Sequence, residues 1–329
     1  MSYQSPAKVQ HYVPQFLLRN FGRGKKHHLH VFDKQTERAF ETNVKNVAGE
    51  NHFYDFDLKG HKLTLEPSLS QLESKTKPVL DRLLNADTIH VLSPEERAWL
   101  SVFFAVQFTR TRAFREQWRA LPELIDEKLR RMAKSDDDLQ AVEELIRRPD
   151  ENQTTLEVAR FMIDAPKDFA PHFASKTWLL LQTDRRAPFM IGDNPLTLQN
   201  SIDMGPLGNI GLGVRGIEIY FPLSPSRALA MWCPSHEEMF RNAATNLRRL
   251  PPEIAATHIR DPSGIEEIAT AMDTGRPLRF KPINVINFNS LQILYAERYI
   301  FSSVEDFTLA REIISSHPNV RYGPRARIN

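Results

Sequence analysis

The stretch AKVQHYVPQFLLRNFGRG, residues 7–24, places an imidazole, a phenol and a carboxamide close together near the beginning of the chain. His11 can take up or release a proton near neutral pH. Neither a strand nor a helix pattern requires the polar set His11, Tyr12 and Gln15. The apolar residues that follow predict a short buried helix ended by a glycine: Phe16, Leu17, Leu18, Phe21 and Gly22. We therefore predict that this segment is docked into a polar pocket, which is the functional site.

A cationic residue interrupts the apolar face of the segment SPEERAWLSVFFAVQFTRTRAFREQW, residues 93–118. A serine cap, a proline at the first helical position and a glutamate three residues after the cap predict one long helix. On a helical wheel, Arg110 falls in the middle of the apolar face and Gln107 beside it. A guanidinium there is costly unless acceptors meet it. We predict that Arg110 is buried or lines the pocket; the alternative is that it extends into water.

Carboxylates that could meet Arg110 occur on a helix predicted over residues 66–85. Glu66 and Glu73 are seven residues apart, so they lie two turns apart on one side of this helix, at the edge of its leucine stripe. From there they can reach a cleft between the helix and its neighbour. The alternative is that Glu73 forms an ordinary solvated pair with Lys77.

A third polar feature is the sequence IGDNPL, residues 191–196, where an apolar strand ends. Asp193 and Asn194 precede a proline, and such residues stabilise turns through their own backbone. A carboxylate at the end of a buried strand is also where a sheet presents site residues. Both interpretations stay open from the sequence.

Together these side chains form the set that a hydrolase of phosphate esters needs. We predict catalytic roles for His11, Gln15, Gln107 and Arg110. Mg²⁺ or Mn²⁺ would be held by the oxygen-bearing residues Glu66, Glu73, Asp193 and Asn194. His11 would act as the general base, and Arg110 would stabilise the developing charge on the phosphate. The leading hypothesis is therefore a metal-dependent phosphodiesterase or nuclease that acts on nucleic acid.

The alternative hypothesis is a non-catalytic binding module. In it, the same histidine, arginine and carboxylates form a structural network, and the glycine-rich segment 200–216 and the basic tail meet a partner or nucleic acid. Three aromatic residues could stack on bases, although such residues are more often part of a core: Phe53, Tyr54 and Phe56. The sequence leaves open whether the chain is an enzyme and which oligomer it forms.

Composition excludes several other classes. The 329 residues carry a net charge of +2, which gives no general electrostatic attraction to nucleic acid or anionic membranes. Cys233 is the one cysteine, so the chain has no internal disulfide and no cysteine-type zinc site. No nucleophile elbow is present, and GLGVRG lacks the Lys-Ser/Thr of a phosphate loop. No apolar run is long enough to span a bilayer, and the first residues lack a signal core. We expect a cytoplasmic protein without a membrane anchor.

The elements that must position these residues predict an α+β fold with more helix than strand. Strands are predicted at 27–33, 51–57, 61–65, 177–183, 187–196 and 217–233, and we expect a mostly antiparallel sheet from segments 27–65 and 177–232. A helical block, 66–176, and a helical C-terminal part, 235–316, would surround that sheet. We expect residues 1–329 to form one large domain.

Seven motifs of the chain resemble a widespread bacterial family, domain-of-unknown-function family 4238: HYVPQFLLRNF, ENHFYDF, LEPSLSQLE, FFAVQFTRTR, GDNPL, FPLSPSRALAM and NVINFNSLQILYAERYIFSS. The family usually has Tyr-Leu where this chain has Phe16-Leu17, and a proline or small residue where it has Arg112. The resemblance implies one shared fold and no established activity. It also places nine residues on matching motif positions: His11, Pro14, Gln15, Glu66, Glu73, Gln107, Arg110, Asp193 and Asn194.

Overall fold

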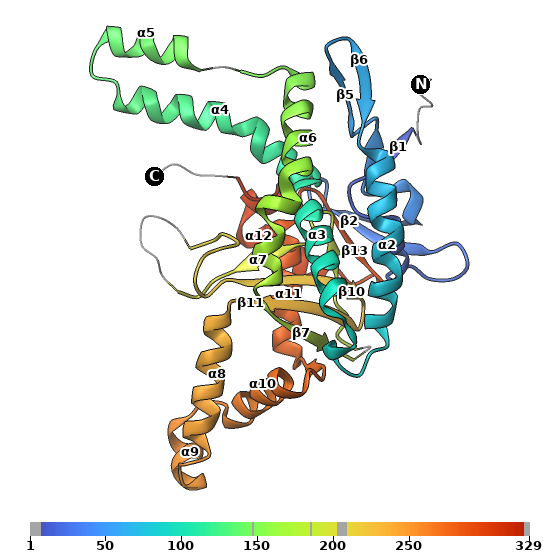
Figure 1. Cartoon of the computed structure of the whole chain (residues 1–329), viewed down its shortest axis with the longest axis vertical. Helices are drawn as coiled ribbons and strands as arrows, with labels where there is room; N and C mark the ends of the chain where they lie inside the picture. The colour runs from blue at the N-terminus through green and yellow to red at the C-terminus, as the bar shows by residue number, and fades with distance from the viewer. Residues whose placement is uncertain (1–7, 147, 185, 203–208, 326–329) are drawn as a thin grey trace.

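The computed structural model describes residues 8–146, 148–184, 186–202 and 209–325 and has the predicted α+β architecture (Figure 1). The helices are α1 (Gln15–Arg19), α2 (Glu66–Leu84), α3 (Pro94–Thr109), α4 (Arg112–Met132), α5 (Asp136–Leu145), α6 (Glu151–Asp168), α7 (Ala170–Ala174), α8 (Pro234–Leu247), α9 (Pro252–His258), α10 (Pro262–Thr274), α11 (Pro282–Tyr295) and α12 (Thr308–Ser316). The strands are β1 (Val9–His11), β2 (His28–Asp33), β3 (Arg38–Asn43), β4 (Gly49–Asn51), β5 (Asp55–Leu58), β6 (His61–Thr64), β7 (Thr177–Gln182), β8 (Ile191–Gly192), β9 (Thr197–Gln199), β10 (Glu218–Ser224), β11 (Arg227–Trp232), β12 (Leu278–Arg279) and β13 (Tyr299–Ser302).

The strands of the described chain divide among separate sheets rather than joining one. A five-stranded sheet has the order β12-β7-β11-β10-β9, and a four-stranded sheet has the order β3-β2-β13-β8. The pairs β1-β4 and β5-β6 form two small antiparallel ribbons. The pairing of β12 with β7 is parallel, whereas the other pairings are antiparallel. The mostly antiparallel character that the sequence predicted is therefore confirmed.

The part of the chain predicted as helical after residue 235 also contributes strands. β13 lies between β2 and β8 in the four-stranded sheet, and β12 lies at the edge of the five-stranded sheet. Apolar alternation in such short segments is too brief to distinguish from a helix end. The N-terminal and C-terminal regions thus share one sheet, through the pairing of Phe32 with Ile300.

The segment predicted as one long helix is two helices. Ser93 and Glu96 form the predicted capping box of α3, but α3 ends at Thr109. Thr111 then caps α4 by accepting a hydrogen bond from the backbone N–H of Phe114. The chain changes direction at Arg110, where its side chain enters the interior. A helical wheel drawn across 93–118 therefore misplaces the residues after the break.

The core that carries the site is built around α3. Leu100, Phe103 and Phe104 are buried, and the two phenylalanine rings pack against Phe221 of β10 at centroid distances of 6.1 and 5.1 Å. Each buried ring of this size contributes about 1.5–3 kcal/mol by leaving water. α2 packs beside α3, and β1, which pairs with β4, lies next to α2 (Figure 1). This arrangement gives the N-terminal segment two rigid helices to dock on.

The N-terminal segment that contains α1 ends at Gly22, a position that requires glycine. Phe16, Leu17 and Leu18 of α1 are buried, as the sequence predicts. At Gly22, an added Cβ would lie 2.9 Å from the backbone of His27. No side chain fits in that space, so the chain can turn from α1 into β2 only with glycine at this position.

Candidate functional site

The backbone of the HYVPQF segment is held by side chains from the C-terminal end of α3 and from the loop before β5. β1 pairs with β4 so that His11 lies opposite Gly49, and the N–H of Tyr12 donates to the carbonyl of Ala48 at 2.8 Å. The carbonyl of His11 accepts from Arg110 Nη2 at 2.7 Å, and the carbonyl of Tyr12 accepts from Gln107 Nε2 at 3.0 Å. Arg110 and Gln107 therefore fix the position of the HYVPQF backbone through hydrogen bonds to its carbonyl groups.

Arg110 is buried, as predicted, with 1% of its surface exposed. Its Nη2 also donates to Glu73 Oε1 at 2.8 Å, and its Nε donates to the hydroxyl oxygen of Tyr54 at 3.2 Å. The Tyr54 hydroxyl lies 3.2 Å from the carbonyl oxygen of His11, to which it donates. One guanidinium thus connects β1, α2 and the loop before β5.

A pocket of about 310 Å³ opens in front of this network. The residues that line it come from β1, α1 and α2: His11, Gln15, Phe16, Arg19, Glu66, Ser70, Glu73, Ser74 and Lys77. The structure therefore brings four of the predicted site residues together in one pocket. We call this the His11 pocket.

His11 lines one wall of the His11 pocket, and its imidazole can take up or release a proton. Its Nε2 lies 3.2 Å from the carbonyl oxygen of Lys45, and its Nδ1 lies 3.3 Å from Gln15 Nε2. When Nε2 carries the proton, it donates to that carbonyl and leaves the lone pair on Nδ1. Burial lowers the pKa of His11 below its usual 6.5. The lowered pKa favours the neutral imidazole, which can accept a proton.

The two carboxylates of α2 that line the pocket have different environments. Burial, opposed by Arg110 and assisted by Glu73 and Asp55, raises the pKa of Glu66 above 4.5. Glu66 Oε2 is buried and has no hydrogen-bond partner among the described residues. Glu73, in contrast, is an ion-pair partner of Arg110. Glu66 is thus the carboxylate in this pocket whose oxygen is free for a ligand.

Asp193 and Asn194 do not join the His11 pocket. The Asp193 carboxylate is fully buried and accepts backbone N–H bonds from Glu297, Arg298 and Tyr299 at 2.7–2.9 Å. Asn194 Nδ2 donates to the carbonyl of Tyr295 at 3.2 Å. These two residues fix the connection between α11 and β13, a long-range role that neither of the two interpretations from the sequence contained.

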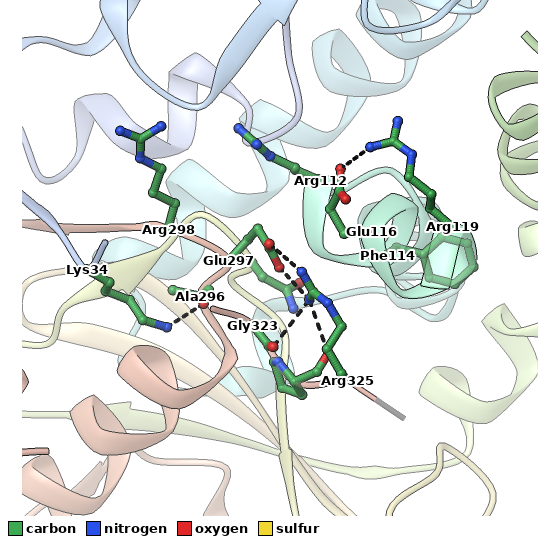
Figure 2. Close-up of polar contacts among 12 residues, drawn as sticks. Lys34, Arg112, Phe114, Glu116, Arg119, Ala296, Glu297, Arg298, Gly323 and Arg325 are labelled. Atoms are coloured by element: carbon green, nitrogen blue, oxygen red, sulfur yellow. Dashed lines mark hydrogen bonds and ion pairs between the residues drawn. The ribbon is translucent and has the colours of Figure 1, made fainter. Parts of the chain in front are cut away.

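A second polar cluster surrounds this connection (Figure 2). Lys34 Nζ donates to the carbonyls of Ile293 and Ala296 at 2.7 and 2.5 Å. The buried Glu297 forms a two-pronged ion pair with Arg325 at 2.7 and 2.8 Å. Desolvation lowers the pKa of Lys34 to about 8 and raises that of Asp193 to about 6. Because its polar groups are satisfied by each other and by backbone, this cluster is a structural one.

Sequence reasoning missed four polar residues of the His11 pocket: Arg19, Ser70, Ser74 and Lys77. The sequence contains a signal for the three of them that lie on α2, which are Ser70, Ser74 and Lys77. Residues 66, 70, 73, 74 and 77 recur at helical spacing, so they form one polar stripe on α2 beside the leucine stripe. Arg19 lies one turn after Gln15 on α1 and donates to its Oε1 at 3.2 Å.

Within the described residues, no group of three or more His, Cys, Asp or Glu side chains is arranged to hold a metal ion. Among the same residues, none of the helices combines the length and apolar character that a membrane crossing requires. The predicted base-stacking residues Phe53, Tyr54 and Phe56 are buried in the core. Of the glycine-rich segment and the basic tail, residues 203–208 and 326–329 lie outside the described residues.

Fold and site together define an α+β protein whose N-terminal HYVPQF segment is held by Gln107 of α3 and by Arg110 at the C-cap of that helix. The chain belongs to the family described as "Protein of unknown function (DUF4238)", whose model matches residues 9–306. Neither the comparison with curated proteins nor that with solved structures found a match.

The anchoring role of Gln107 makes a testable prediction. Gln107→Leu should lower the free energy of unfolding by about 1 kcal/mol, because the buried carbonyl of Tyr12 loses its donor. Urea denaturation measures this change. Gln140→Leu on the exposed face of α5 is the matched control and should change stability by less than about 0.5 kcal/mol. Equal stability of the two variants would contradict the anchoring role.

Proposed function

We propose that the chain hydrolyses phosphodiester bonds of nucleic acid in the His11 pocket. The observation that supports this proposal is the meeting of a neutral imidazole with two carboxylates in one pocket that also contains cations. His11 comes from β1, whereas Glu66 and Glu73 come from α2. Arg19 lines the same pocket and supplies positive charge for phosphate oxygens, and Lys77, whose ammonium group is paired with Asp81, lies beside it.

In the proposed reaction, His11 acts as the general base. A water molecule takes the position of the Gln15 amide beside Nδ1 and gives up a proton to it. The water oxygen bonds to phosphorus, the phosphorus–oxygen bond to the leaving group breaks, and the leaving oxygen takes a proton from solvent. Arg19 offsets the charge that develops on the phosphate.

As in the hypothesis from the sequence, the proposed cofactor is Mg²⁺ or Mn²⁺. Glu66 and Glu73 would hold it, and the ion would supply charge stabilisation at the phosphate. Mg²⁺ is commonly bound through one or two carboxylates, with substrate phosphates and water completing its coordination. A site of two carboxylates therefore suits an ion that binds together with the substrate. The raised pKa of Glu66 means that protons compete with the ion at low pH.

Arg110 and Gln107 have a supporting role in this proposal. Arg110 does not line the pocket; it bonds the carbonyl of His11 and the carboxylate of Glu73. It is therefore a positioning residue that fixes the spacing between the base and one carboxylate. Gln107 does the same for the backbone one residue further along.

The test is a cleavage assay with bis(p-nitrophenyl) phosphate and with labelled single-stranded and double-stranded oligonucleotides, with Mn²⁺, Mg²⁺ or EDTA. We expect kcat/KM to fall at acid pH, because burial lowers the pKa of His11 below its usual 6.5 and a protonated imidazole cannot act as a base. Activity should be retained as the pH falls to 6.5 and lost as His11 protonates. A midpoint above 6.5 would contradict the role of His11.

A second candidate function is a binding module that retains an anionic ligand without cleaving it. One observation favours it: the network of Arg110, Glu73, Tyr54 and the His11 carbonyl is explained by anchoring alone. The same assay distinguishes the two functions. Oligonucleotide binding without product in any of the metal conditions would support the binding module and overturn the hydrolase.

A further inference from the structure

A second pocket, of about 370 Å³, lies under the five-stranded sheet and shares no lining residue with the His11 pocket. Its walls include residues of the strands β10, β11 and β12 and of the helices α8, α10 and α11, of which α8 and α10 lie in the lower half of Figure 1. Neither the family motifs nor the proposed hydrolysis gives this pocket a role. We call it the Glu218 pocket after the carboxylate that lines it.

Aromatic rings form much of the wall of the Glu218 pocket. Trp232 and Phe240 are stacked at a centroid distance of 6.0 Å, and Tyr220 meets Phe288 edge-on at 5.7 Å. Phe280 completes this wall. Tyr220, Trp232 and Phe288 are almost fully buried, so their positions are fixed by packing. Such a wall offers π faces and apolar area to a small ligand.

Glu218 is a carboxylate with little access to water, since 16% of its side chain is exposed. Its Oε2 accepts from the Tyr220 hydroxyl at 2.5 Å and from Gln199 Nε2 at 2.7 Å. Its Oε1 lies 3.6 Å from His236 Nε2, which itself lies 2.8 Å from the carbonyl oxygen of Gly216. The neutral donors Tyr220 and Gln199 fix the carboxylate in place but do not neutralise it, and His236 Nε2 is within hydrogen-bond distance of the Gly216 carbonyl rather than of the carboxylate.

The cations that line the Glu218 pocket are engaged elsewhere. Lys281 Nζ is paired with Asp261 at 2.8 Å, and the side chain of Arg279 is 78% exposed. Among the described ion pairs, none joins Glu218 to a lysine or an arginine. A partly buried carboxylate without a cation is energetically costly, and a bound cation would remove that cost.

From these contacts we propose that the Glu218 pocket binds a small organic cation with an apolar body. The ammonium group contacts Glu218 Oε1, and the body packs against Trp232, Phe240 and Phe288. A cation gains both from the carboxylate and from the negative faces of the rings. A neutral ligand of the same shape gains only the packing, and an anion is repelled by Glu218.

Isothermal titration with 2-phenylethylamine, 2-phenylethanol and phenylacetate tests this proposal on the full chain. The three probes share a ring and differ in charge. We expect the amine to bind at least about tenfold more tightly than the alcohol, as a charged hydrogen bond provides. Equal binding of amine and alcohol, or no binding of the amine at millimolar concentration, would overturn it. Guanosine binding in place of the amine would also overturn it, in favour of a base-binding site.

Glu218→Gln is the matching variant, because glutamine can still accept the Tyr220 hydroxyl hydrogen bond. It should reduce amine binding to the level of the alcohol while leaving alcohol binding within about twofold. Glu267→Gln removes the same charge from an exposed position that also lines the pocket, and it should change amine binding by less than about threefold. Equal effects of the two variants would overturn the contact with Glu218.

Discussion

Replacing Arg110 by methionine should lower the free energy of unfolding by about 3 kcal/mol. The side chain is almost fully buried, and its loss leaves the carbonyl of His11, the Tyr54 hydroxyl and the Glu73 carboxylate without their shared donor. Methionine fills much of the volume but donates no hydrogen bond. Urea denaturation of the full chain, followed by circular dichroism, measures the change.

Arg131→Met is the control for this measurement. The Arg131 side chain is 61% exposed on α4 and forms an ion pair with Glu127 of the same helix. Its replacement should change stability by less than about 0.5 kcal/mol. If Arg110→Met were as mild as Arg131→Met, Arg110 would not be the residue that anchors the HYVPQF segment.

His11→Ala should lower kcat/KM for phosphodiester cleavage by about 100-fold or more while leaving stability within about 1 kcal/mol. Loss of a general base removes the proton acceptor for the attacking water. The stability effect is small because the ring makes only peripheral hydrogen bonds, to Lys45 and Gln15. Initial rates and thermal melting of the same preparation give the two quantities.

His61→Ala, on the exposed strand β6, is the control for His11→Ala and should retain full activity. Two outcomes would contradict the general-base role. One is an unchanged rate in His11→Ala; the other is a loss of activity that parallels a loss of folded protein.

Local patterns predicted the parts of the site that come from single helices. The apolar face of α3 identified Arg110 as buried, and the seven-residue spacing placed Glu66 and Glu73 on one side of α2. That Arg110 pairs with Glu73 was one of the options that the sequence offered. That Arg110 and Gln107 also bond the carbonyls of His11 and Tyr12 was not visible, because backbone carbonyls carry no sequence signal.

The position of Asp193 shows why other parts of the site could not be predicted. Its carboxylate caps the N–H groups of residues 297–299, about 100 residues away in the chain. This contact depends on β8 pairing with β13, and β13 lies in a region whose pattern predicted helix. Tertiary pairing of short strands is decided by packing rather than by local propensity.

The central claim is that the His11 pocket binds a metal ion and a phosphodiester together. Anomalous scattering from crystals of the full chain, grown with Mn²⁺ and a slowly hydrolysed phosphorothioate dinucleotide, tests it most directly. We predict a manganese peak at Glu66 and Glu73 with the phosphorothioate between His11 and Arg19. An empty His11 pocket in crystals that hold the dinucleotide elsewhere would contradict the claim.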